Sequence, residues 1–434
     1  MSFTFAGIFV VLVFWRPQEW LVPQIFGWPL LDIVVFTSIM GLVVDIHQGK
    51  MQFPRGPAPY MIAGLWFATV MSHVAHFYFE GMMNTIPETG KICFFALLML
   101  CVIDRPSRAR SMAIIFVTGA VLMSIHAIMQ LTLGSGFQGA PPLYTEHVVT
   151  GEPVIRAIFF GIFSDPNDLA QILVAMLPFV FAVPRRITLG SIFLIVALTS
   201  LILTAFYFTH SRGGMVGILT VAVIFVLLWL PTRWMPAAAL ILLGGGLAVC
   251  AFQGSLLMDP SAQDRVVFWG LANGFFKEHF IFGIGYGMFW QVASDRAAHN
   301  AFVSSYTELG FFGYWFWFGL VMIGVVGCWR TRLFLAKPRN DDQRYMRRFA
   351  GVCLAAMGGF CASAYFLSRA WIFPMFFLMA ILCAVPLIVE KMMVVDRPLV
   401  STVRDVFVTN TVSAMASIFY IYLTILILNK AFYG

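Results

Sequence analysis

Charged residues are scarce in this chain. Asp, Glu, Lys and Arg make up 11% of its 434 residues, whereas hydrophobic residues make up 60%. Soluble domains carry about 25% charged and roughly 45–50% apolar residues. A soluble chain this poor in charge would lack the polar surface to cover itself, so the composition excludes an ordinary water-soluble domain.

Several motifs of other protein classes are also missing. The seven cysteines lie within or at the ends of apolar segments, which excludes a disulfide framework and a CxxC metal site. The sequence contains no HExxH, no Asp-x-Asp pair and no serine elbow. His73 and His76 are three apart on a helix, but no third ligand is near in sequence. We therefore expect no metal and no cofactor. The segment 3–15 lacks a preceding basic region, so a cleaved signal peptide is not expected.

Long apolar runs are abundant instead. A bilayer core of about 30 Å needs roughly 20 apolar residues per helix, and segments such as 111–133, 189–208 and 406–428 reach that length. Backbone groups in lipid must bond internally, which leaves helices or a closed barrel. Because the runs are continuous and do not alternate with polar residues, the sequence predicts helices.

The runs predict an all-α polytopic membrane protein with about 12 transmembrane helices, 1–434 forming a single membrane domain. The expected spans are 3–15, 28–46, 58–79, 86–103, 111–133, 167–183, 188–209, 213–230, 235–252, 301–328, 348–367, 370–389 and 406–428. The first is short for a span, so it either crosses with help from its neighbours or is partly re-entrant. The expected count is therefore 12 or 13.

The basic residues orient the chain, because cytoplasmic loops are enriched in Lys and Arg. Most of the 27 basic residues fall in or at the edges of six short loops, which we assign to the cytoplasm: 47–57, 104–110, 184–187, 231–234, 329–347 and 390–405. The opposite side carries Arg16, Lys91, Arg156, Arg212, Arg265, Lys277, Arg296, Arg369 and Lys430. It also holds the two long loops, 134–166 and 253–300, and long loops are where membrane enzymes usually keep their chemistry.

Arg212 stands in Thr-His-Ser-Arg-Gly-Gly, where one long apolar run meets the next. A charge at or just inside the interface is unfavourable unless it is paired or hydrated, which makes Arg212 a candidate site residue. The alternative is a structural role, in which Arg212 extends from a tight turn to the membrane interface. The following glycines permit a sharp turn and the close approach of a ligand.

Loop 253–300 carries more candidates. Residues 264–277 mix apolar side chains with Arg265 and Lys277 and can form a helix in the interface plane. Residues 282–287, Phe-Gly-Ile-Gly-Tyr-Gly, predict a flexible glycine turn at the membrane surface, since no βαβ unit supports a dinucleotide site. His299 opens the next span and titrates near neutrality, so it can accept or donate a proton.

Loop 134–166 ends in a helix-entry signal. Asp165 is the expected N-cap and Pro166 the first helical residue. Asn167 and Asp168 would then face the aqueous side at the top of a span.

Taken in order, these motifs resemble the O-antigen ligase and O-antigen polymerase superfamily of bacterial inner-membrane glycosyltransferases. The resemblance rests on Asp165-Pro166-Asn167, Ser211-Arg212-Gly213-Gly214, Arg265 with Trp269, the glycine turn 282–287, His299-Asn300, and Glu308 with Gly310. The usual proline of the glycine turn is replaced by Phe280. Residues 15–20, Trp-Arg-Pro-Gln-Glu-Trp, also resemble an N-terminal element of some ligase-like members.

The resemblance implies a GT-C type fold and transfer of a glycan from undecaprenyl diphosphate to an acceptor on the periplasmic side, without a metal. It implies catalytic roles for Arg212, Arg265 and His299. Additional candidates for binding donor or acceptor are Arg156, Asn167, Asp168, Lys277 and Arg296. Arginine suits the diphosphate because its planar fork matches phosphate oxygens.

Several reactions share this donor. We expect an O-antigen ligase that modifies lipid A-core, since the chain length and modest loops favour it over a polymerase or a protein O-oligosaccharyltransferase. A lipid flippase or transporter is a different class, and such proteins place ionisable groups near the bilayer midplane. Here the candidates gather at one interface, which favours an enzyme. No carboxylate stands out as a nucleophile, so inversion is expected.

Overall fold

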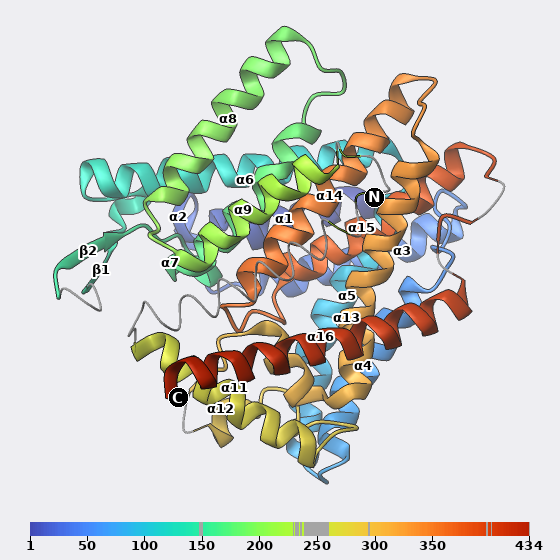
Figure 1. Cartoon of the computed structure of the whole chain (residues 1–434). Helices are drawn as coiled ribbons and strands as arrows, with labels where there is room; N and C mark the ends of the chain where they lie inside the picture. Colours follow the sequence, from blue (N-terminus) through green and yellow to red (C-terminus); the bar gives the residue numbers. More distant parts are fainter. Residues whose placement is uncertain are drawn as a thin grey trace.

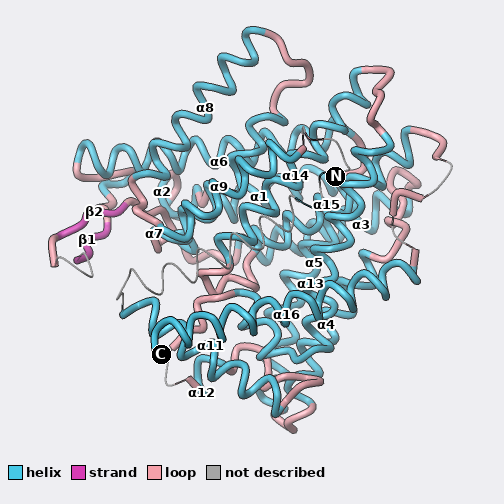
Figure 2. The backbone as a smooth tube through the Cα atoms, in the orientation of Figure 1, coloured by secondary structure: helices cyan, strands magenta, loops and turns pink. Residues whose placement is uncertain are grey.

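The computed structural model describes residues 1–146, 151–228, 230, 234, 237, 260–293, 296–395, 398–400 and 402–433. It is predominantly helical, with 75% of the described residues in helices (Figures 1 and 2). The longer helices are α1 (Ser2–Phe14), α3 (Leu30–His47), α4 (Ala58–Val74), α5 (Phe79–Val102), α6 (Pro106–Leu133), α7 (Pro166–Met176), α8 (Leu189–Tyr207), α9 (Arg212–Leu227), α11 (Pro260–Glu278), α13 (Ala301–Phe334), α14 (Asp341–Ala364), α15 (Phe373–Met392) and α16 (Val403–Tyr433). Short elements are α2 (Pro17–Trp20), α12 (Phe289–Val292) and the 3-10 helices η1 (Pro23–Ile25), η2 (Phe137–Gly139), η3 (Gly161–Phe163) and η4 (Leu177–Ala182).

Seven of the described helices are long and apolar enough to cross a membrane: α3, α5, α6, α8, α13, α15 and α16. Shorter apolar helices are Ser2–Phe14, Pro166–Ala182 and Arg212–Leu227. These helices support a multi-pass membrane protein, and the total of 12 stays a prediction. The expected span 235–252 lies almost wholly outside the described residues.

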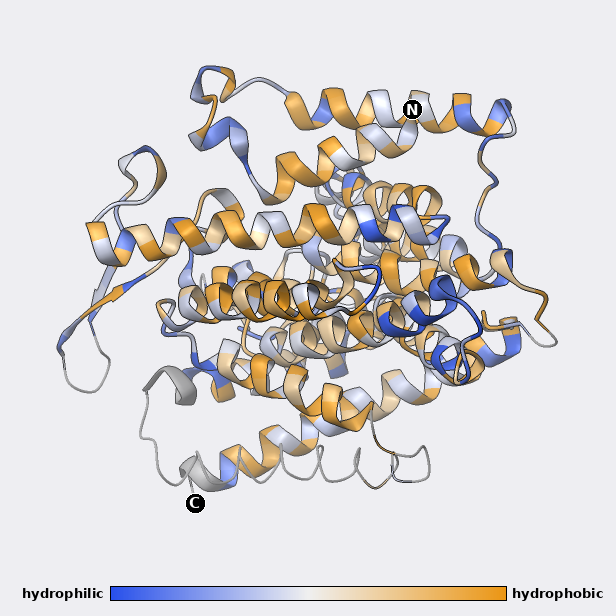
Figure 3. Ribbon diagram, turned by 90° about the horizontal axis from the view of Figure 1, so that it is seen from above, coloured by the Kyte–Doolittle hydropathy of each residue, from blue (hydrophilic) through white to orange (hydrophobic). Residues whose placement is uncertain are grey.

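The helices form a buried centre and an apolar periphery. In α15, 83% of the most apolar stretch is buried, against 22% in α3 and in α8. Helix α13 contacts α4, α14, α15 and α16, and α14 also contacts α9. Figure 3 shows apolar residues along the helices and hydrophilic residues mainly in loops and at helix ends. Peripheral helices with exposed apolar side chains fit a lipid environment.

The first segment follows α6 along its length. The Arg108 guanidinium carbon lies over the Phe3 ring, 5.1 Å from the ring centroid. The Trp15 indole N–H donates to the Ile115 carbonyl at 2.9 Å. Trp20 then stacks on the ring of Phe137, beyond the last residue of α6, at 4.5 Å. Helix α1 has 13 residues and is followed by the four-residue helix α2; whether this first segment crosses the membrane stays a prediction.

Helix α13 is broken at Gly310, whose φ is 64° and ψ is −172°. Residues 280–285, which we call the strap, lie across the break. They form hydrogen bonds with backbone groups that the break leaves without a partner inside the helix. Phe311 N–H donates to the first carbonyl of the strap at 2.7 Å, and Gly285 N–H donates to the Glu308 carbonyl at 3.0 Å. An interrupted helix is tolerated in a membrane protein where such groups are satisfied again.

The strap corrects the expectation of a flexible glycine turn at 282–287. His76 Nε2 also contacts the Gly283 carbonyl oxygen at 2.7 Å, which ties the strap to the region just after α4. A Cβ on Gly283 would overlap the Glu308 backbone. Gly283 is therefore explained by the close approach of one backbone to another, whereas Gly285 and Gly287 have positive φ values of 108° and 71° that favour glycine.

One departure from an all-helical fold lies in loop 134–166. Strands β1 (Leu143–Glu146) and β2 (Pro153–Arg156) pair antiparallel, with Leu143 opposite Arg156. This hairpin projects from the helical body at the left of Figure 1. It was missed because four-residue strands give too short a pattern to recognise.

Candidate functional site

Three helices begin around the candidate site, each with a polar N-cap. Asp165 accepts from the N–H of Asn167 at 2.7 Å at the start of α7, as expected from the sequence. Ser211 accepts from Gly214 N–H at 3.2 Å at the start of α9, and Asn300 accepts from Phe302 N–H at 3.0 Å at the start of α13. The positive ends of helix dipoles favour a nearby anion.

Asn167 joins the first two of these helix starts. Its side-chain oxygen accepts from Ser211 Oγ at 2.9 Å and from Arg156 Nη2 at 3.2 Å. Arg156 Nε also donates to the Thr209 carbonyl at 2.8 Å. Arg156 thus fastens β2 to α7 and to the α8–α9 turn. Two of the hydrogen bonds of the Arg156 guanidinium therefore hold the fold together, while its positive charge remains at the site.

Arg212 is the first residue of α9 and is exposed. Arg156 lies within electrostatic range of both Arg212 and Asp165. Partial burial lowers the pKa of Arg156, the Asp165 carboxylate raises it, and the charge of Arg212 lowers it. An arginine side chain stays charged at neutral pH even when partial burial lowers its pKa, so Arg156 and Arg212 form one positive patch.

The glycines after Arg212 serve helix packing. A Cβ on Gly213 would lie 3.1 Å from Phe366 Cβ, and one on Gly214 would lie 3.0 Å from Ala170 Cβ. The sequence alone indicates that these glycines permit a ligand to approach the backbone closely. The structure instead shows helix α9 lying close to α7 and to the residues that follow α14.

His299 sits next to the N-cap of α13 in a left-handed backbone conformation, with φ 50°. Its side chain is exposed, and it lies within electrostatic range of Arg265, Arg296, Arg369 and Asp165. Desolvation lowers the pKa of His299 below 6.5, and the three arginines lower it further. The imidazole is therefore mainly neutral at pH 7 and able to accept a proton.

Trp269 positions this part of the chain. Its indole N–H donates to the carbonyl of Ala298, the residue before His299, at 2.6 Å. Trp269 is one helical turn after Arg265 on α11, so the spacing R-x-x-x-W joins a charged residue to an anchor. The anchor connects α11 to the start of α13.

Arg369, in the loop between α14 and α15, was counted on this side of the membrane but not selected from the sequence. Its Nε donates to Asp168 Oδ1 at 2.7 Å, and its Nη2 donates to Oδ2. The hydrogen bonds to Asp168 raise the pKa of Arg369, which stays charged. Arg369 could have been selected on the same ground as Arg212, because both are arginines in a short loop between two expected spans.

Asp168 corrects one expectation. It does not face water, because its side chain is only 6% exposed. Its position in the first turn of α7 directs it toward the α14–α15 loop, where Arg369 compensates the buried charge.

Arg296 and Lys277 are the remaining candidates. Arg296 is 64% exposed, with Nη1 3.9 Å from an Asp264 oxygen. Lys277 Nζ lies 5.3 Å from the Tyr422 ring centroid. Its place on α11 is about 18 Å along the axis from Arg265. Binding roles for Arg296 and Lys277 stay predictions.

Residues 197–318 match the family described as O-antigen ligase. This segment runs from α8 to the middle of α13 and contains Arg212, Arg265 and His299. The match confirms the resemblance to the O-antigen ligase and polymerase superfamily. No curated protein sequence matches the chain.

Proposed function

We propose that this chain, which carries an O-antigen ligase family domain, transfers a glycan from undecaprenyl diphosphate to lipid A-core at the periplasmic face of the bacterial inner membrane. The main supporting observation is the electrostatic proximity of His299 to Arg265, Arg296 and Arg369. Arg212 and Arg156 add the positive patch beside Asp165. A neutral base among several cations suits a reaction in which a hydroxyl attacks and a diphosphate leaves.

The reaction is a single displacement. The acceptor hydroxyl oxygen attacks the anomeric carbon, and the bond from that carbon to the diphosphate oxygen breaks. The leaving diphosphate keeps the electron pair, and Arg212 and Arg265 stabilise its charge without a metal. His299 accepts the hydroxyl proton.

Two of the described carboxylates near the site are already engaged in other interactions, which supports inversion. Asp168 is engaged by Arg369, and Asp165 caps α7. Neither is placed as a nucleophile for a covalent glycosyl intermediate, which a retaining double displacement through a carboxylate would require.

The acceptor distinguishes the ligase from its relatives. We expect the purified protein, supplied with an undecaprenyl-diphosphate-linked glycan, to form a new glycosidic bond with lipid A-core. A product formed only with a second lipid-linked glycan would identify a polymerase, and one formed only with a protein acceptor would identify an O-oligosaccharyltransferase. Movement of the lipid-linked glycan across a vesicle membrane without formation of a glycosidic bond would identify a transporter and contradict the proposal of an enzyme.

The activity should depend on pH through His299. A base must be neutral to act, and the pKa of His299 lies below 6.5, so kcat/KM should rise below that pH and level off near neutrality. Replacing Arg296 with Gln removes a neighbouring positive charge and should shift the rise toward higher pH. A pH profile of both proteins measures this, and an identical profile for His299→Gln would contradict the base role.

A further inference from the structure

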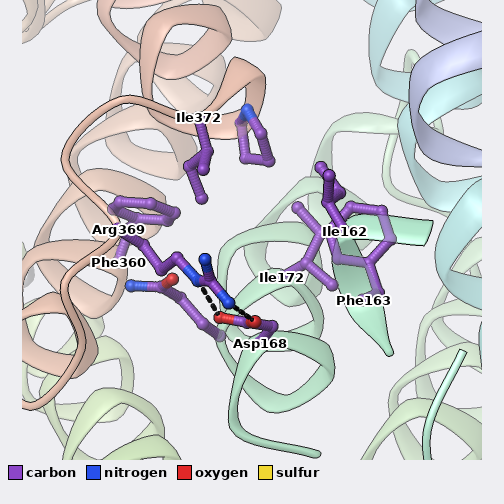
Figure 4. Close-up of a pocket in the computed structure, with 9 residues that line it drawn as sticks. Ile162, Phe163, Asp168, Ile172, Phe360, Arg369 and Ile372 are labelled. Atoms are coloured by element: carbon purple, nitrogen blue, oxygen red, sulfur yellow. Dashed lines mark hydrogen bonds and ion pairs between the residues drawn. The ribbon is translucent and has the colours of Figure 1, made fainter. Parts of the chain in front are cut away.

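A small cavity lies beside the candidate site, between the first turns of α7 and the loop before α15. It has a volume of about 70 Å³, and its lining includes Asp168, Arg369 and Gln171. Apolar walls include Phe163 and Phe360 (Figure 4). A space of this size holds ordered water or part of a sugar ring. Asp168 in this lining follows Asn167, whose side-chain oxygen accepts from Ser211 Oγ at 2.9 Å, so the cavity adjoins the start of α9, where Arg212 lies.

Gln171 is the unusual member of this lining. It is 1% exposed, and its Nε2 makes no hydrogen bond to any described residue. A buried amide without a partner is unfavourable by about 1–3 kcal/mol, so such groups usually meet water or a ligand.

Gln130 on α6 provides the contrast. It is also 1% exposed, but its Oε1 accepts from Ile158 N–H and its Nε2 donates to the Pro141 carbonyl, both at 3.0 Å. Gln130 fastens the loop after α6 to the segment before α7. The fold therefore uses one buried glutamine as a structural bridge and leaves the other facing a cavity.

The charges in the lining limit which chemical class of ligand the cavity can bind. The Asp168 carboxylate and the Arg369 guanidinium neutralise each other in a two-bond pair. A phosphate placed there would meet a carboxylate beside the guanidinium. An uncharged hydroxyl avoids that repulsion, because it can accept from one group and donate to another.

We propose that this cavity is a subsite for an uncharged sugar hydroxyl, bound through the Gln171 amide and the Asp168–Arg369 pair. The inference rests on the proposed function. The sugar belongs either to the donor glycan or to the acceptor, since both carry such hydroxyls. The apolar walls cover the C–H faces of the sugar.

The test is Gln171→Met, which keeps the side-chain length and removes the amide. In transfer assays with the full-length protein, we expect the KM for one glycan substrate to rise about tenfold, the loss of roughly one hydrogen bond, at unchanged kcat. The melting temperature should stay the same or rise, because an unsatisfied buried amide is removed. A rise in KM for the undecaprenyl-linked glycan assigns the sugar to the donor, and a rise for lipid A-core assigns it to the acceptor.

Gln130→Met is the matched control, expected to lower the melting temperature and leave both KM values unchanged. The subsite is overturned if Gln171→Met leaves both KM values unchanged or lowers the melting temperature as Gln130→Met does. Failure of both Gln171→Met and Gln171→Leu to fold also overturns it, since the amide would then serve the structure. Absence of transfer by the unmodified protein with every acceptor contradicts the proposed function itself, whereas the other outcomes contradict only the subsite.

Discussion

Arg212→Ala should lower kcat for glycan transfer about 100- to 1,000-fold, the usual effect of removing one donor that stabilises charge in a transition state. Arg212 is exposed at the start of α9, and its charge acts on the same patch as Arg156. Arg212→Lys should recover only part of the rate, because an ammonium cannot bind a diphosphate in the bidentate manner. Single-turnover transfer from the lipid-linked donor measures the effect.

Arg344→Ala is the appropriate control for a lost surface charge. Arg344 is 62% exposed and pairs with Asp341 in the first turn of α14, on the side assigned to the cytoplasm. Its removal should leave the rate unchanged. Equal rates for Arg212→Ala and the unmodified protein, at equal yield and melting temperature, would show that Arg212 only anchors the helix at the interface.

Gly310→Ala should destabilise the fold by about 3 kcal/mol or more. With φ 64° and ψ −172°, Gly310 occupies a region that is almost restricted to glycine. A Cβ there would also overlap the Ile281 carbonyl in the strap. The variant has to give up either the break in α13 or the strap. Thermal unfolding in detergent, together with the yield of monodisperse protein, measures the loss.

Gly274→Ala separates this effect from a general sensitivity to substitution. Gly274 lies inside α11, and a Cβ added to it meets no atom of another described residue within 4 Å. Alanine should be neutral there or stabilise the helix by up to about 1 kcal/mol. A melting temperature for Gly310→Ala as high as that of Gly274→Ala would show that the break is not required.

Helix α8, an uninterrupted apolar run, was predicted to within two residues at each end, whereas α6 begins five residues before its expected start and α13 ends six residues after its expected end. The errors fall where helices extend through polar residues. Helix α5 begins at Phe79 instead of 86, through a stretch that contains Glu80, Asn84 and Pro87. Helix α14 begins at Asp341 instead of 348, because Asn340 caps a charged first turn outside the apolar run. Hydropathy locates the apolar part of a helix and not its polar ends.

Sequence patterns selected the candidate residues and assigned them to one side of the membrane, which stays a prediction, but these patterns did not indicate the contacts between the residues. Arg369 and Asp168 are 201 positions apart, and nothing in a single sequence pairs them. The strap was likewise read as a turn, because its partner is the break at Gly310. Both features depend on tertiary contacts, which local patterns do not encode.

The candidate site is assembled from stretches of chain far apart in sequence. Arg212 and Asp168 precede residue 228, His299 and Arg265 belong to 260–300, and Arg369 follows α14. A substrate that touches all three acts as a reversible cross-link between them. By linkage, its binding free energy adds to the cohesion of the fold, amounting to about 2.7 kcal/mol at a concentration 100 times Kd. Occupancy by the proposed lipid-linked donor would thus also determine how firmly these helices are held together in the membrane.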